Sequence, residues 1–288
     1  MKNIVSVHHE SIAFMMTSTL LYAFLNLCVK FLPHIPAVEL IFFRSLISFV
    51  ICATILVIKR VPLLGKNKKW LIIRGLAGIA ALWSYFYTIQ HMPLAEAVTF
   101  QYMSPVFTAI LAGFILSERM NTREWSLLLL ALFGVLIIQG FDHRVSLIFV
   151  AVGLFSALAS GLAYNAVRKL NSSEHPLVII LYFPLVALPI TGAVSATQWV
   201  MPSGIDWLYI LAMGLFTQGG QYFMTKAIQQ KPLSQLTYLN YLGIVYALIL
   251  GFVCFNETFH PAALFGMLLV CSGVLLNLRI NLKSEAAS

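Results

Sequence analysis

Four polar side chains in an otherwise apolar stretch share one face of a helix. They are Gln218, Gln221, Tyr222 and Thr225, spaced at i, i+3, i+4 and i+7. Amide and phenol groups in this pattern either bind a polar solute or hydrogen-bond neighbouring helices. We expect solute binding, because the adjoining Gly219-Gly220 pair would allow a substrate or a helix to approach closely.

A second polar set recurs in two distant apolar stretches. Gln101-Tyr102 in one stretch corresponds to Asn240-Tyr241 in the other, and Tyr238 lies one helical turn before Tyr241. These residues lie about nine positions into their stretches, roughly 13 Å at about 1.5 Å per residue. That depth is too great for an interfacial tyrosine belt, so we expect them to contact a solute.

Other interior polar and aromatic residues admit two interpretations each. Trp83, Asn26 and Asn165 either line the same solute site or fix contacts between helices. Arg44 lies about eight residues into an apolar stretch, roughly 12 Å at about 1.5 Å per residue. A guanidinium at this depth needs a partner, which is either a substrate carboxylate or carbonyls and another helix.

Two prolines are expected to weaken the helices that contain them. Pro105 and Pro184 each remove one backbone donor from an apolar stretch. Such a kink is either tolerated as it stands or serves as a gate.

The amino-acid composition indicates the class of protein that carries these residues. Hydrophobic residues make up 60% of the 288-residue chain and charged residues 10%, whereas soluble domains carry about 25% charge. A soluble enzyme, a nucleic-acid-binding module and a disordered chain are therefore excluded. The remaining class is an all-α integral membrane protein, because each span must form its backbone hydrogen bonds within itself.

Ten transmembrane helices are expected to fill the chain. They are expected at 11–30, 36–58, 69–90, 93–117, 124–140, 146–168, 176–196, 205–228, 232–255 and 261–280. With the N-terminus inside, almost every Lys and Arg falls on the inner side, Arg74 included, and only Lys30 and Arg144 fall outside. The positive-inside rule then predicts cytoplasmic termini in a bacterial-type inner membrane.

A shift of 139 residues superimposes the second half of the chain on the first. Under this shift Pro93 meets Pro232, Tyr102 meets Tyr241, and Glu118 meets Glu257. Each half, 1–140 and 146–283, holds five expected spans, so the second must enter the membrane inverted. Inverted repeats are typical of secondary transporters, whose substrates bind between the halves.

The segment PLAEAVTFQYMSPVFTAILAGFILSER, the GVLII that follows it and their echo in the second half resemble the EamA family of drug/metabolite transporters. The resemblance implies a central cavity lined by spans 1, 3, 4, 6, 8 and 9. It also implies that spans 5 and 10 are free to form a homodimer. The basic residues Lys30 and Arg44 match positions common in the family.

The sequence thus predicts a transporter for a small polar metabolite, an amino acid or amino-acid-like compound, working by alternating access and most simply in export. The alternatives are uptake or exchange of a nucleotide-like metabolite or vitamin, such as S-adenosylmethionine or riboflavin. More remote alternatives are a membrane scaffold or a lipid-modifying enzyme. No catalytic, nucleotide-binding or metal-ligand motif is present, so no enzyme activity, cofactor, metal or nucleic-acid partner is expected.

The charge pattern makes a direct prediction about topology. Cysteines introduced in the loop 59–69 should resist an impermeant thiol reagent applied to intact cells, because this basic loop is expected in the cytoplasm. Labelling of the loop from outside would reverse the orientation.

Overall fold

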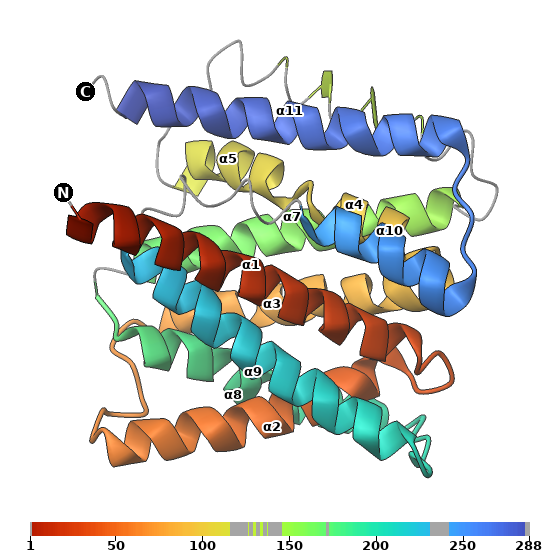
Figure 1. Ribbon diagram of the computed structural model, residues 1–288. Helices are drawn as coiled ribbons and strands as arrows, with labels where there is room; N and C mark the ends of the chain where they lie inside the picture. Colours follow the sequence, from red (N-terminus) through yellow and green to blue (C-terminus); the bar gives the residue numbers. More distant parts are fainter. Residues whose placement is uncertain are drawn as a thin grey trace.

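The computed structural model describes residues 2–115, 146–170, 173–230 and 242–285, with a few positions between 126 and 137. All regular secondary structure in these ranges is helical, as expected (Figure 1). The helices are α1 (Lys2–Lys30), α2 (Ala37–Ile58), α3 (Lys68–His91), α4 (Leu94–Gln101), α5 (Ser104–Ile115), α7 (Leu147–Leu170), α8 (Pro176–Ser195), α9 (Asp206–Gln230), α10 (Leu242–Phe255) and α11 (Pro261–Glu285).

Six segments of the described chain are long and apolar enough to cross a bilayer. They are Glu10–Lys30, Ala37–Ile58, Lys68–His91, Leu94–Ile115, Leu147–Leu170 and Leu177–Ser195. These segments coincide with six of the expected spans. Helices α9, α10 and α11 occupy three more, and nearly all of the expected span 124–140 lies outside the described residues. The full set of ten therefore stays a prediction.

Prolines mark where several helices begin. Helices α2 and α4 follow Pro36 and Pro93, while Pro176 and Pro261 are the first residues of α8 and α11. Proline suits these places because the first helical N–H groups have no partner within the helix.

The expected span 93–117 is two helices rather than one. Helix α4 ends at Gln101 and α5 begins at Ser104, so the break falls directly before Pro105. A proline ring crowds the carbonyl four residues earlier, which here belongs to Gln101, and it leaves that carbonyl without its usual donor. By contrast, α8 continues through Pro184.

Each of the most extensive helix contacts joins one helix from each half. These contacts are α1 with α9, α3 with α7, and α2 with α8. The shift of 139 residues converts α1–α9 into α7–α3 and α2–α8 into itself. Corresponding helices also run in opposite directions, as the colours of α1 and α7 or α3 and α9 show in Figure 1. The contacts therefore agree with a pseudo-twofold axis that relates two inverted repeats.

Individual glycine contacts obey the same relation. A Cβ atom at Gly75 would lie 2.9 Å from the side chain of Val186, and one at Gly214 would lie 2.4 Å from Ile47 Cδ1. Gly75 and Gly214 are 139 residues apart, as are Ile47 and Val186. Two equivalent close approaches of helices thus depend on the absence of a side chain.

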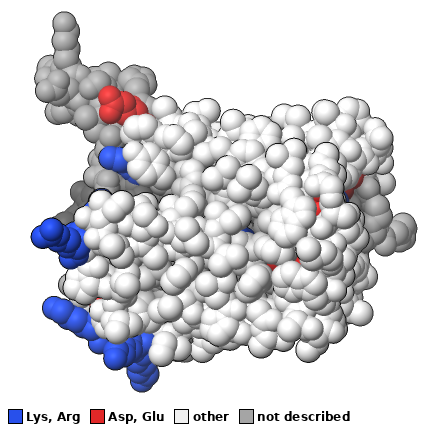
Figure 2. Space-filling view, turned by 90° about the horizontal axis from the view of Figure 1, so that it is seen from below, with Lys and Arg blue, Asp and Glu red and all other residues white. Residues whose placement is uncertain are grey.

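Basic side chains gather at the end of the molecule where α1 and α3 begin, which we call the basic end (Figure 2). The loop after α2 and the first turn of α3 supply Lys59, Arg60, Lys66, Lys68 and Lys69. Elsewhere the visible surface is almost free of charge. Large apolar side chains such as Phe114 and Leu147 are exposed on other helices of the molecule. This surface suits contact with lipid.

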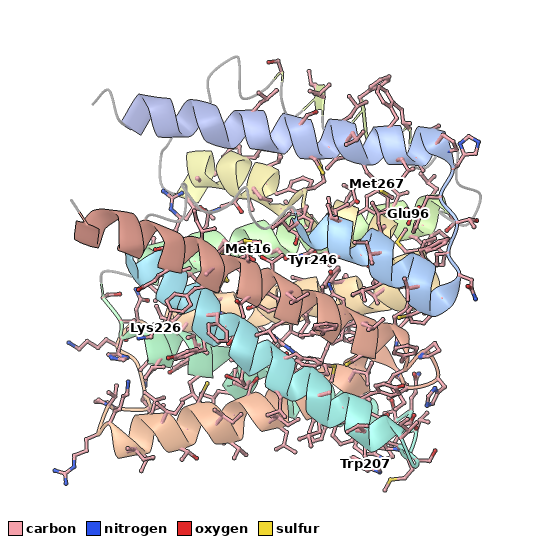
Figure 3. All side chains as sticks on the ribbon, in the orientation of Figure 1. Met16, Glu96, Trp207, Lys226, Tyr246 and Met267 are labelled. Atoms are coloured by element: carbon pink, nitrogen blue, oxygen red, sulfur yellow. The ribbon has the colours of Figure 1, made fainter. Side chains whose placement is uncertain are left out.

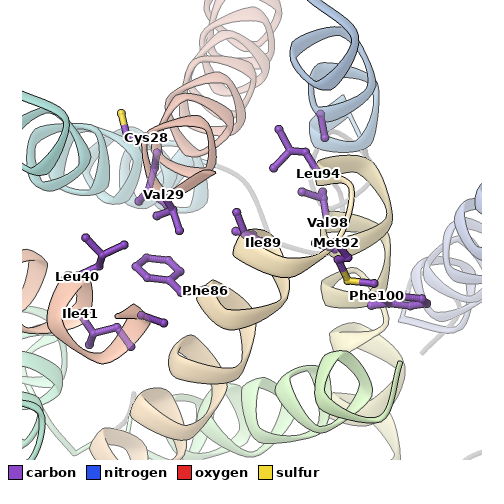
Figure 4. Packing of buried hydrophobic residues seen from close by; sticks show 14 of the residues in the cluster. Cys28, Val29, Leu40, Ile41, Phe86, Ile89, Met92, Leu94, Val98 and Phe100 are labelled. Atoms are coloured by element: carbon purple, nitrogen blue, oxygen red, sulfur yellow. The ribbon is translucent and has the colours of Figure 1, made fainter. Parts of the chain in front are cut away.

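A hydrophobic core of buried side chains lies at the opposite end (Figure 4). It includes Val29, Phe86, Ile89, Leu94 and Val98, all of them buried, from α1, α3 and α4. Several elements of the first half therefore pack tightly where α1 and α3 finish.

The glycine contacts can be tested by a double-mutant cycle. Gly214→Ala should lower thermal stability in detergent, since overpacking a tight contact costs about 1–3 kcal/mol. Ile47→Ala should also destabilise alone, but the double variant should lose less than the sum, because the first change fills space that the second creates. Gly192→Ala is the control, because its nearest new contact would be 3.3 Å away. Strict additivity would contradict this account of the contact.

Candidate functional site

Arg44 of α2 is buried where the two halves meet. Its side chain is 7% exposed, and its Nε donates a 3.0 Å hydrogen bond to Thr217 Oγ1 of α9. Its guanidinium carbon lies 5.2 Å from the centre of the Phe183 ring on α8. Phe183 is the residue that the 139-residue shift assigns to Arg44. Arg44 therefore contacts its own repeat mate, as residues near a twofold axis do.

Arg74 of α3 reaches the same aromatic ring. Its guanidinium carbon also lies 5.2 Å from the Phe183 ring centre. Gly78, one turn along α3, leaves room for this arrangement, because a Cβ there would be 2.8 Å from the Phe183 ring and 3.1 Å from Arg74 Nη1. No Asp or Glu in the described ranges forms an ion pair with either arginine.

Tyrosines from α1 and α7 lie near the arginines. Tyr22 of α1 interacts electrostatically with both arginines. Tyr164 of α7 interacts with Arg74, Tyr22, Tyr85 and Tyr102. Tyr164 is nevertheless 47% exposed, so this cluster is not sealed from the surface. Its phenol groups can donate or accept hydrogen bonds.

Asn26 and Asn165 are both buried but bond differently. Asn26 Nδ2 donates to the Tyr85 hydroxyl at 2.9 Å, within the first half. Asn165 Nδ2 donates to the carbonyl oxygens of Thr108 at 2.9 Å and Gly161 at 3.0 Å, and the first of these bonds crosses between the halves. Both side chains thus fix helix contacts in this conformation.

Gln101 and Tyr102 contact the second half of the chain. Gln101 Nε2 donates to Ser160 Oγ at 2.9 Å, and its Oε1 accepts from Ser156 Oγ at 2.8 Å. The Tyr102 phenol packs so closely against Gly243 of α10 that a Cβ there would lie 2.1 Å from its oxygen. These residues end α4 at the helix break, directly between the two halves.

The four-residue face of α9 divides in the structure. Gln218 Nε2 donates to Ser48 Oγ of α2, and Gln221 is half-buried. Tyr222 is 58% exposed and lies on the same face as the exposed residues Leu208, Leu211 and Leu215. It packs edge-on against Phe223 and lies under Lys226 near the basic end (Figure 3).

The remaining predicted residues add little to this cluster. Trp83 is partly buried against the main core. The Gly219-Gly220 pair accepts Leu21 and Tyr22 of α1, so the close approach here is that of a helix. Tyr238, Asn240 and Tyr241 lie outside the described residues. No cluster of His, Cys, Asp or Glu in the described part of the chain could hold a metal ion.

A buried ion pair lies at the end opposite the basic end. Lys30 Nζ is 3.1 Å from Glu257 Oε1 and also donates to the Met92 carbonyl. Glu257 Oε2 accepts from the Leu94 N–H at 2.9 Å. The pair joins the end of α1 and the α3–α4 junction to the segment after α10. Glu96 lies nearby in the first turn of α4 (Figure 3).

Several residues of the cluster were not among those expected from the sequence, and they include Arg74, Phe183, Thr217 and Tyr164. Arg74 was assigned to the inner basic residues, because it lies only six positions into α3. Phe183 and Thr217 are an ordinary apolar and a small polar residue. The signal for both lay in the repeat, which pairs Phe183 with Arg44 and Thr217 with Gly78.

Comparison with known proteins identifies the family. A model of the EamA-like transporter family matches residues 10–140 and 147–279. The pseudopaline exporter CntI of Pseudomonas aeruginosa is 31% identical over 244 residues, 84% of each chain. Human solute carrier family 35 member G1 is 28% identical over 263 residues, covering 83% of this chain and 72% of that protein.

A solved crystal structure shares the fold. It has a TM-score of 0.65 at 19% identity and covers 96% of this chain and 99% of its own. The two family matches fall on the two halves that the helix contacts relate, and the similar proteins are named as transporters rather than enzymes. The chain is therefore an integral membrane transporter that belongs to the EamA-like family of the drug/metabolite transporters.

Proposed function

We propose that the protein is a secondary transporter that moves a small polar metabolite, amino-acid-like in chemistry, by alternating access. The observation that carries this proposal is the polar cluster between the two halves. Arg44–Thr217, Gln218–Ser48 and Gln101–Ser160 are all hydrogen-bonded pairs with one residue from each half. Interior polar groups at the interface of inverted repeats are where such transporters bind their solutes.

The name of a relative supports a direction of transport, and the charge pattern supports an orientation in the membrane. The Pseudomonas aeruginosa protein is named as an exporter, which favours export here as well. The basic end would face the cytoplasm of a bacterial-type inner membrane under the positive-inside rule. Helix α1 begins and α11 ends on that side (Figure 1).

The two ends of the molecule support one state of an alternating-access cycle. The end opposite the basic end is closed by the hydrophobic core, by the Lys30–Glu257 pair and by a hydrogen bond from the Val200 N–H to Glu39 Oε2. Tyr164, in the part of α7 that leads to the basic end, is half-exposed. The polar cluster would then be reached from the cytoplasm.

The substrate contacts are proposed for the conformation that binds solute. Gln101 and Gln218 are bonded to serines here, so a solute would have to exchange those bonds for its own. Tyr102 and Gln221 lie at the same interface, and Tyr241, Asn240 and Tyr238 extend the proposal on the symmetry of the repeat. Tyr222 and Trp83 are expected to contribute least to substrate binding. Tyr222 faces outward, and Trp83 packs against the main core.

The Lys30–Glu257 pair should hold the closed end shut. The test uses a variant in which the other three cysteines are replaced, so that Cys28 is its single thiol. Cys28 is buried two positions before Lys30. An impermeant thiol reagent added from outside should label it slowly. Glu257→Gln should raise the rate several-fold, because removing one partner of a buried pair destabilises the closed state. Glu10→Gln, at the other end of α1, is the control. Equal rates in both variants would remove the pair from the gating scheme.

Counterflow in proteoliposomes tests the transport function itself. Labelled amino acids, S-adenosylmethionine and riboflavin would each be tested against their own unlabelled pool, with and without a pH gradient. An amino acid or amino-acid-like compound should exchange, since the site offers amides, phenols and guanidinium groups. Exchange of S-adenosylmethionine or riboflavin alone would favour the vitamin or nucleotide-like alternative. No flux of any compound by folded protein would count against a transporter of this substrate class.

A further inference from the structure

Arg44 is incompletely paired. Its Nε is bonded to Thr217, but its Nη1 is buried without a hydrogen-bond partner in the described part of the chain. A guanidinium inside a membrane segment ordinarily pairs with an acid or with carbonyl groups. A buried donor without a hydrogen bond costs free energy, so we expect Arg44 Nη1 to gain a partner in the functional state.

Arg74 has the same deficit. Its Nε is buried and lacks a hydrogen-bond partner within the described ranges. Both guanidinium carbons lie 5.2 Å from the same ring centre, so they can be separated by no more than twice that distance. Two positive charges this close inside a protein repel each other, yet no carboxylate of the described residues compensates them.

The acidic residues that could have served are engaged elsewhere. Glu257 pairs with Lys30 and accepts from Leu94, while Glu39 accepts from Val200. Both lie at the closed end. The group that would pair with the two arginines is therefore an anion that these residues do not supply.

We propose that Arg44 and Arg74 together bind the acid groups of the transported solute, which is a small compound with two carboxylates. This inference rests on the proposed transport function and names its substrate class. Each guanidinium can hold a carboxylate through two parallel hydrogen bonds, and two carboxylates match the two positive charges. The Phe183 ring, 5.2 Å from both guanidinium carbons, would lie beside the carbon chain between them.

Three five-carbon probes separate charge from size. Glutarate and L-glutamate carry two carboxylates, whereas L-glutamine carries one and is nearly the same size. Thermal unfolding of the purified protein in detergent measures binding, and counterflow in proteoliposomes measures transport. A series from succinate to suberate extends the chain length. Dicarboxylates should raise the melting temperature and exchange across the bilayer, and L-glutamine should do neither.

Variants assign the effect to the two arginines. Arg44→Gln and Arg74→Gln should each weaken dicarboxylate binding by at least about tenfold, the loss expected for a hydrogen bond to a charged group. Arg60→Gln, which removes an exposed arginine at the basic end, should bind as the unaltered protein does. Thr217→Val keeps both charges but frees Arg44, so it should weaken binding while preserving the preference for dicarboxylates. If Arg44→Gln does not fold, Thr217→Val still tests whether the position of the Arg44 guanidinium matters for binding.

The outcomes distinguish this inference from the proposed function. Equal stabilisation by L-glutamine, or none by any dicarboxylate, would overturn the acid site. Transport of a solute without carboxylates, unchanged in both arginine variants, would keep the transporter and reject the acid site. Dicarboxylate binding that the arginine substitutions abolish, without flux of any compound, would keep the acid site and reject the transport proposal.

Discussion

A charged or polar group inside a bilayer must be met by protein, water or ligand, because hydrocarbon offers it no partner. The interior of this transporter is arranged around that constraint. Amides are matched with serines and asparagines with carbonyls or a phenol. Lys30 is matched with Glu257. Arg44 and Arg74 are only partly matched, and they stand between the two halves. No carboxylate of the described residues pairs with these two guanidinium groups, so the proposed solute would supply the missing anion.

The repeat explains how one interface can be both symmetric and specific. Gly75 and Gly214 make equivalent close contacts with Val186 and Ile47, so the two halves pack alike. Three residues further along α3 and α9, the backbone positions still correspond but the side chains differ. Gly78 faces Phe183 in one contact, whereas Thr217 bonds Arg44 in the equivalent one. A shared backbone arrangement thus carries an aromatic ring on one side of the axis and a positive charge on the other.

Much of the fold could be predicted from the sequence, because apolar runs, prolines and the repeat are local or directly visible in it. The helix break at Tyr102 and Met103 could be located only roughly, since proline weakens a helix without dictating where it ends. The site was harder to predict. Arg74 looked like a flanking charge, but its long side chain reaches inward to Phe183. Tyr222 has the spacing of a solute-facing residue, yet the rotation of α9, set by packing against α1 and α2, turns it outward.

The most direct test is an experimental structure of the protein with saturating L-glutamate in lipid nanodiscs. Ligand density is expected beside Phe183, with one carboxylate within hydrogen-bond distance of Arg44 Nη1 and the other within hydrogen-bond distance of Arg74 Nε. A ligand bound away from this ring, with both arginines satisfied by protein carbonyls alone, would contradict it.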